Sequence, residues 1–141
     1  MATVELRFSA SPEHVRTARL VAAAVARRAG VDESVLDELR LAVGEACSRA
    51  VGLHAVHGLT TPVRVTLSEG ETAFSIEVGD DAPLPGAAAP GGPAAGQSGE
   101  GEADELGLAV IRGLVDDLEV TSDARGGLIR MSWPAKPPTL T

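Results

Sequence analysis

The chain has 141 residues, of which 44% are hydrophobic but only 2% are aromatic. This length predicts one domain, and the composition predicts a core built from aliphatic side chains. The formal net charge of −8 has the same sign as a phosphate backbone, which argues against direct nucleic-acid binding. The single cysteine, Cys47, excludes an internal disulfide, and we expect it to pack as a small hydrophobic residue.

The start of the chain and its apolar runs bear on location. The sequence MATVELRF has neither the basic beginning nor the apolar stretch of a secretory signal. No run reaches the roughly 18 apolar residues that a membrane span needs. We therefore expect a cytoplasmic protein without membrane contact.

The first predicted elements are a strand and a helix. Apolar and polar residues alternate over 4–8, which is the period of a half-buried strand. Ser11, Pro12 and Glu13 are typical of a helix start: serine can cap free amides, proline is tolerated at the first position, and glutamate suits the positive end of the dipole. We expect this helix to end at Gly30.

A second helix is predicted from a cap at Asp32 to about Gly52. Apolar residues recur over 36–50 at steps of three and four, which is the spacing of one buried helix face. Glu45 and Arg49 lie one turn apart on a neighbouring stripe. Such a pair is worth roughly 0.2–0.5 kcal/mol when exposed, so a solvated ion pair and a functional site both remain open.

The rest of the chain predicts a hairpin, a long loop, a third helix and a second hairpin. The predicted ranges are strands 63–67 and 74–78, loop 82–103, helix 106–115, and strands 118–121 and 128–133. This order predicts an α+β two-layer sandwich, with a mixed, mostly antiparallel sheet and its helices on one face. We expect one domain over 1–133 and a disordered tail over 134–141.

The loop over 82–103 consists mainly of alanine, proline and glycine, a composition from which we expect a flexible segment. Such long loops in small domains are lids, binding loops or dispensable insertions. A simple linker is the remaining alternative.

Three segments in a fixed order resemble anti-sigma factors of the RsbW and SpoIIAB type. They are Phe8-Ser9-Ala10 with the later Ala18-Arg19, the stretch VGEACSRAV, and the stretch GLAVIRGLVDDLEV. The resemblance implies a small serine kinase with the histidine-kinase-like ATPase fold. It also implies roles for four residues: Glu45 as general base, Asp80 as adenine contact, Gly107 in the second glycine-rich box, and Arg19 as contact to sigma factor and antagonist.

Six departures from the family pattern disfavour ATP binding. Arg49 stands where the family has a magnesium-ligating asparagine, and a guanidinium has only donors. Ala82, Leu84 and Glu105 stand where the family has glycines, so they add side chains or negative charge at those positions. Gly127 and Leu128 stand where the family has threonines, so two hydroxyl groups are missing. A lost hydrogen bond to a charged group costs about 1.5–3 kcal/mol. We predict a closed Glu45–Arg49 pair in a vestigial nucleotide pocket; the alternative is that Arg49 contacts phosphate directly.

The resemblance implies an anti-sigma factor that sequesters a sigma factor and is controlled by a STAS-domain anti-anti-sigma protein. A basic stripe on the first helix supports a protein-binding surface, and it consists of Arg16, Arg19, Arg27 and Arg28. We expect no cofactor, or ATP with magnesium if the site still works. Two alternatives remain, an active serine kinase that phosphorylates the antagonist and a STAS-binding scaffold without a sigma partner. A homodimer is possible.

The histidines show no metal-ligand pattern, so we predict no metal site. His54 and His57 follow the expected end of the second helix. At such a position a histidine contacts terminal carbonyls or solvent. We assign neither a functional role.

Overall fold

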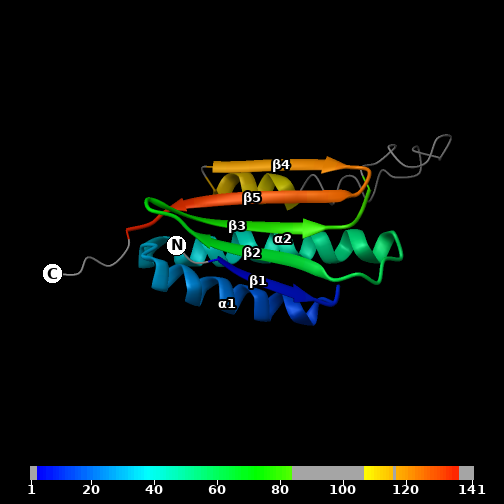
Figure 1. The fold of residues 1–141 in the computed structure, drawn as a ribbon, viewed down its shortest axis with the longest axis horizontal. Helices are drawn as coiled ribbons and strands as arrows, with labels where there is room; N and C mark the ends of the chain where they lie inside the picture. Colours follow the sequence, from blue (N-terminus) through cyan, green and yellow to red (C-terminus); the bar gives the residue numbers. More distant parts are fainter. Residues whose placement is uncertain (1–2, 84–106, 116, 137–141) are drawn as a thin grey trace.

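Five strands form one sheet in the order β1-β2-β3-β5-β4 (Figure 1). The computed structural model describes residues 3–83, 107–115 and 117–136. The strands are β1 (Thr3–Phe8), β2 (Val63–Glu69), β3 (Ala73–Asp80), β4 (Asp117–Asp123) and β5 (Gly126–Pro134). All four pairings are antiparallel, so the predicted α+β class is confirmed, and the described sheet is antiparallel throughout rather than mixed.

Three helices cover one face of this sheet. They are α1 (Glu13–Ala29), α2 (Leu36–Val56) and the helix 107–114, drawn in yellow behind β4 and β5 in Figure 1. The short helix η1 (Glu33–Val35) leads into α2. The result is the predicted two-layer arrangement.

The core lies between the sheet and the helices. Residues that point inward on neighbouring strands lie opposite each other. Val65 pairs with Val78, Leu67 pairs with Ile76, and all four side chains are buried. The buried face of α1 consists largely of alanine, which lets the helix lie close to the strands. Cys47 is fully buried in this core, as predicted, and burial raises the pKa of its thiol to about 12.

The ends of α1 are formed differently from one another. Gly30 ends the helix with φ of 98°, a left-handed conformation that glycine adopts without strain, so the predicted end is confirmed. At the other end, no side chain among the described residues forms a capping hydrogen bond. The Ser11 hydroxyl instead donates to the Glu13 carboxylate at 2.9 Å, and the Ser11 carbonyl accepts from the His14 amide at 3.1 Å. The predicted serine cap was therefore wrong.

Helix α2 begins as expected but ends later. Asp32 Oδ1 accepts from the Ser34 amide at 2.9 Å, so its cap serves η1 immediately before α2. The helix continues four residues beyond Gly52, to Val56. Burial of Val51 and His54 stabilises this last part and outweighs the helix penalty of glycine.

The C-terminal part of the described chain corrects the predicted tail. Pro134 belongs to β5, and Ala135 is buried. The Ala135 amide donates to the Thr72 carbonyl, and the Lys136 amide to the Gly30 carbonyl, both at 3.0 Å. These bonds fix residues 134–136, which we had expected to be disordered. Residues 84–106 and 137–141, with most of the predicted loop and tail, lie outside the described residues.

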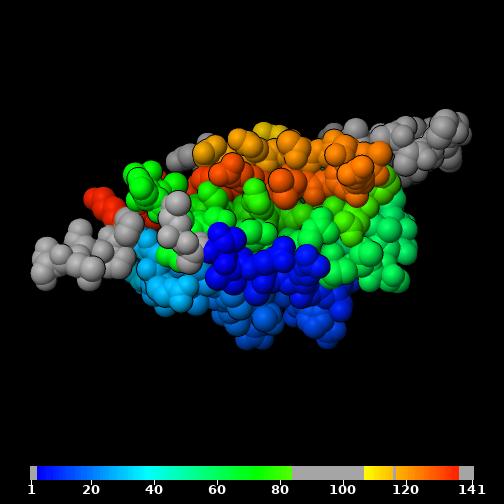
Figure 2. Space-filling model, viewed as in Figure 1, coloured from blue at the N-terminus to red at the C-terminus, as the bar shows by residue number. Residues whose placement is uncertain are grey.

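The face of the sheet opposite the helices is polar. Figure 2 shows side chains of β1 to β5 at the surface on this side. The rows across it follow the register, and one row is Glu5, Thr66, Glu77, Arg130 and Glu119. Within the described ranges, no helix is long and apolar enough to cross a membrane.

Candidate functional site

The predicted nucleotide residues gather where α2, the end of β3 and the start of β5 meet. Glu45 and Arg49 are partly buried on α2, and Asp80 is the last residue of β3. Gly107 begins the helix 107–114. A Cβ atom added at Gly107 would lie 3.9 Å from Glu45 Oε2, so Glu45 lies beside the start of that helix.

Asp80 is the most constrained of these residues, because its side chain is only 3% exposed. Its Oδ1 accepts from the Ala82 amide at 2.9 Å and from the Gly127 amide at 3.2 Å. Its Oδ2 lies 3.7 Å from Nη1 of Arg49, whose side chain is 12% exposed. The carboxylate is thus surrounded by protein donors from three segments of the chain.

The predicted ion pair between Glu45 and Arg49 was wrong. Within the described part of the chain, Arg49 pairs with Asp80 and no ion pair joins it to Glu45. The physical reason is burial: a buried carboxylate without a cation costs several kcal/mol, whereas an exposed pair one helical turn apart contributes about 0.2–0.5 kcal/mol.

Gly126 and Gly127 allow β5 to approach Asp80. A Cβ atom at Gly127 would lie 3.0 Å from Asp80 Oδ2, and one at Gly126, where φ is 155°, would lie 2.0 Å from the Asp80 carbonyl oxygen. From the sequence alone, Gly127 indicated only a lost hydroxyl. In the sequence, the adjacent residues Gly126 and Gly127 were the signal of this close approach, because glycines let one backbone segment lie very near another.

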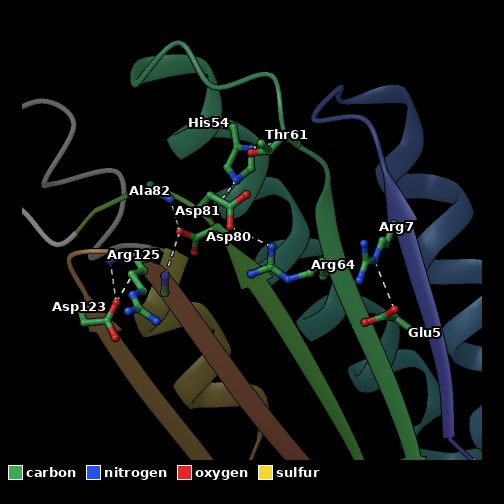
Figure 3. A network of polar contacts seen from close by, with 12 residues as sticks. Glu5, Arg7, His54, Thr61, Arg64, Asp80, Asp81, Ala82, Asp123 and Arg125 are labelled. Atoms are coloured by element: carbon green, nitrogen blue, oxygen red, sulfur yellow. Dashed lines mark hydrogen bonds and ion pairs between the residues drawn. The ribbon is translucent and has the colours of Figure 1, made fainter.

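His54 lies within α2 rather than after its end, and it is fully buried, so of the two surroundings expected for it, terminal carbonyls or solvent, the structure excludes solvent. The Asp81 amide donates to Nε2 at 2.9 Å, and Nδ1 lies 3.0 Å from the Thr61 carbonyl oxygen. Since an amide can only donate, Nε2 is the acceptor and Nδ1 carries the proton. Figure 3 shows the ring between Thr61 and Asp81, so His54 joins the end of α2 to the segment after β3.

Asp81 follows Asp80 but points to a different partner. Its Oδ1 accepts from Nη1 of Arg64 at 2.9 Å (Figure 3). Hydrogen bonds from the Thr61 side chain and then from Arg64 lower the pKa of Asp81 below its usual 3.8. The carboxylate of Asp80 therefore forms an ion pair with Arg49, and the carboxylate of Asp81 forms one with Arg64.

The residues present do not fit a magnesium ion at the position of Arg49. A guanidinium carries donors and a fixed positive charge, so it cannot ligate a cation. Asp80 already accepts two amide hydrogen bonds and faces Arg49. Across residues 3–83, 107–115 and 117–136, no group of three or more histidine, cysteine, aspartate or glutamate side chains could hold a metal.

The basic stripe of α1 divides into two parts. Arg27 pairs with Glu33 at 2.8 Å, and Arg28 with Glu69 at 3.8 Å. Arg16 is exposed, and Arg19 is half-buried with its side chain across Gly44 of α2. The structure therefore leaves Arg16 exposed and brings Arg19 against α2, at the residue directly before Glu45.

The fold and this arrangement define an α+β domain of the ATPase type, and sequence comparison agrees. Residues 8–133 match the histidine kinase-like ATPase domain, so the chain belongs to that family. The structure is similar to that of the RsbU and RsbW domains of Rv1364c from Mycobacterium tuberculosis, with a TM-score of 0.67 and 18% identity. That match covers 100% of this chain and 35% of the other, so this chain spans about a third of that structure. No match was found among the curated proteins.

Proposed function

We propose that the chain is a cytoplasmic anti-sigma factor that holds a sigma factor by surface contacts and releases it to a STAS-domain anti-anti-sigma protein, without binding magnesium-ATP. The observation that carries this proposal is the 3.7 Å approach of Arg49 to Asp80. It puts a fixed cation where the family resemblance implies a magnesium ligand. Arg49 also forms an ion pair with Asp80, whose carboxylate would contact adenine according to the family resemblance.

The nucleotide part of the proposal is supported by the saturation of Asp80. Adenine would have to compete with the amides of Ala82 and Gly127 for Oδ1 and with Arg49 for Oδ2. Each lost hydrogen bond to a charged group costs about 1.5–3 kcal/mol. Two such losses weaken a micromolar ligand by roughly two to four orders of magnitude.

The partner part is supported by family membership and by the likeness to a structure described as containing an RsbW domain. Arg16 and Arg19 have no ion pair within the described residues, in a chain of net charge −8. A positive patch on an acidic protein favours encounter with an acidic partner surface. Without phosphorylation, release would follow the concentrations of the competing partners.

A second candidate function is an active serine kinase that phosphorylates the anti-anti-sigma protein. The position of Glu45 favours it, because its carboxylate lies at the start of the helix 107–114 and is not paired with Arg49. Glu45, which the resemblance implies is the general base, is therefore not paired with Arg49, the cation one turn further along α2.

The proposal is tested with purified sigma factors and STAS-domain proteins from the same organism, by calorimetry with and without magnesium-ATP. We expect binding to one member of each class, competition between them, and no effect of nucleotide. Arg19→Glu should abolish both interactions. Phosphoserine on the STAS protein after incubation with ATP, measured by mass, would favour the kinase instead. Binding to a STAS protein alone would leave only the scaffold alternative.

A further inference from the structure

Strand β4 forms one edge of the sheet. Among the described strands it pairs only with β5, so its other side has no neighbouring strand. Over its seven residues, Asp117–Asp123, every second residue therefore directs its N–H and C=O groups away from the sheet. Figure 1 shows β4 at the edge opposite β1 and α1. A sheet edge of this length can accept a further strand through main-chain hydrogen bonds.

We propose that β4 binds an extended segment of a partner protein as a sixth strand, and that this segment alternates basic and apolar side chains. The inference goes beyond the proposed function and does not depend on it. It assigns a second binding surface, at the end of the molecule that lies away from the arginines of α1.

The charge of the two sheet edges favours β4 as the site for a basic segment. The outward residues of β4 include three exposed carboxylates and no cation: Asp117, Glu119 and Asp123. On β1, Glu5 lies 3.3 Å from Arg7, so the outward charges of that strand cancel. Opposite charge favours encounter and fixes the register of a bound segment. The β4 edge therefore attracts lysine or arginine at every second position of an added strand.

A hollow between β4 and β5 offers space for one basic side chain. Its volume is about 100 Å³, and its lining residues are Asp117, Glu119, Arg130 and Ser132. Arg130 lies between Glu77 and Glu119 in the register of the sheet, so these two carboxylates balance its charge. Asp117 lies opposite the uncharged Ser132. Asp117 is therefore the carboxylate that an incoming ammonium or guanidinium group would contact.

The inner side of β4 is incompletely covered. Leu118 and Val120 point toward the core but are only partly buried. The β5 residues opposite them, Met131 and Ile129, are 0% and 1% exposed. The difference arises because β5 has a strand on both sides and β4 on one side only. Apolar side chains of an added strand would cover Leu118 and Val120 and remove their surface from water.

A second copy of this chain fits the edge poorly. Two β4 strands in fully overlapping antiparallel pairing would place Asp117 of each copy opposite Asp123 of the other. Like charges directly opposite each other destabilise a sheet, and each chain has a formal net charge of −8. The carboxylates thus disfavour pairing between copies and leave the edge to a basic segment.

The test uses the full chain and a short synthetic peptide of alternating lysine and valine. The control peptide has the same sequence with methyl groups on alternate backbone nitrogens, which keeps its charge but removes main-chain donors. Calorimetry should show binding of the first peptide, and binding at least about tenfold weaker for the second. Absence of binding would overturn the proposal. Equal affinities would also overturn it, because the attraction would then depend on charge alone.

Hydrogen exchange shows where the peptide binds. Backbone amides within 117–123 that face away from β5 should exchange more slowly when the peptide is bound, because they then donate to its carbonyl groups. Amides of β1 should be unaffected, although that strand forms the other edge. Protection confined to β1 or to the helices would contradict the assignment to β4.

Asp117→Lys tests the charge, with Glu5→Lys as the matched control. Both residues are exposed at outward positions of edge strands, and both substitutions change the net charge equally. We expect D117K to bind the peptide about tenfold more weakly and E5K to bind as the wild type does. If D117K does not fold, D117N and E5Q make the same comparison with a smaller expected loss. Equal affinities within the pair that is compared would overturn the assignment.

Two further results separate this inference from its alternatives. If sedimentation shows a dimer of the wild-type chain whose β4 amides are protected without peptide, the edge belongs to a second copy and the proposal fails. If the chain binds neither a sigma factor nor a STAS-domain protein, the proposed function fails. The peptide experiment still decides the role of β4 in that case, because it contains neither protein.

Discussion

Nη1 of Arg49 lies 3.7 Å from Oδ2 of Asp80, and the pair connects the middle of α2 to the end of β3. Both side chains are largely buried, at 12% and 3% exposure, so water screens their attraction poorly. The pair contributes to folding, and it consists of the two residues at the positions for which the family resemblance implies contacts to magnesium and adenine. The same two residues should therefore both stabilise the fold and disfavour nucleotide binding.

Replacing Arg49 with methionine should lower the free energy of unfolding by about 1–3 kcal/mol, because Asp80 then lacks its buried cation. In urea denaturation, R49M and D80N together should cost less than the sum of the two single variants. The control is R27M, whose partner Glu33 is mostly exposed and which should cost under about 1 kcal/mol. Strictly additive effects of R49M and D80N would show that the residues do not interact.

His54 should be the neutral tautomer with the proton on Nδ1, because the Asp81 amide donates to Nε2. Long-range nitrogen–proton NMR spectra of the ring check this directly. Replacing His54 with alanine removes two hydrogen bonds and leaves a cavity, so we expect a loss of about 2–4 kcal/mol in stability. Observation of the proton on Nε2 in the native protein would contradict the hydrogen-bond arrangement.

Asp81 should make stability depend on pH. Its folded-state pKa is lowered by hydrogen bonds from Thr61 and Arg64, so its ionised form stabilises the native state above the unfolded pKa. This contribution is lost as the pH falls through the lowered folded pKa. The stability difference between the wild type and D81N should be full above about pH 5 and should shrink toward pH 3. A difference that is constant across this range would contradict the assignment.

Gly30 and Gly58 both have positive φ, but only Gly30 lies against another segment. A Cβ atom at Gly30 would lie 1.8 Å from the Lys136 carbonyl oxygen, whereas one at Gly58 would have no atom of the described residues within 4 Å. G58A should cost about 1–2 kcal/mol through backbone strain alone. G30A should cost clearly more in thermal or urea unfolding, because residues 134–136 must also move. Equal losses would show that the bonds of Ala135 and Lys136 do not hold this segment.

The sequence predicted most of the fold because its periodic patterns are strong. The alternation over 63–67 and 74–78 led directly to β2 and β3, and Gly30 marked the end of α1. The end of α2 was missed because Gly52 resembles a stop signal, while the buried contacts of His54 that extend the helix are distant in sequence. Long-range contacts of this kind leave no local pattern.

The candidate site was predicted less well than the fold. The i,i+4 rule assigned Arg49 to Glu45, although a buried carboxylate 31 positions later in the sequence attracts it more strongly. The choice of partner depends on burial, which the sequence does not display. Arg19 was singled out by resemblance, but its contact with Gly44 required the geometry of two packed helices.

Titration of the wild-type chain with ATP, with and without magnesium, tests the central claim most directly. Calorimetry should detect no magnesium-dependent binding at micromolar nucleotide, because Arg49 and the amides of Ala82 and Gly127 already engage Asp80. Tight, magnesium-dependent binding of ATP would contradict the claim that this protein acts by holding its partners without a nucleotide.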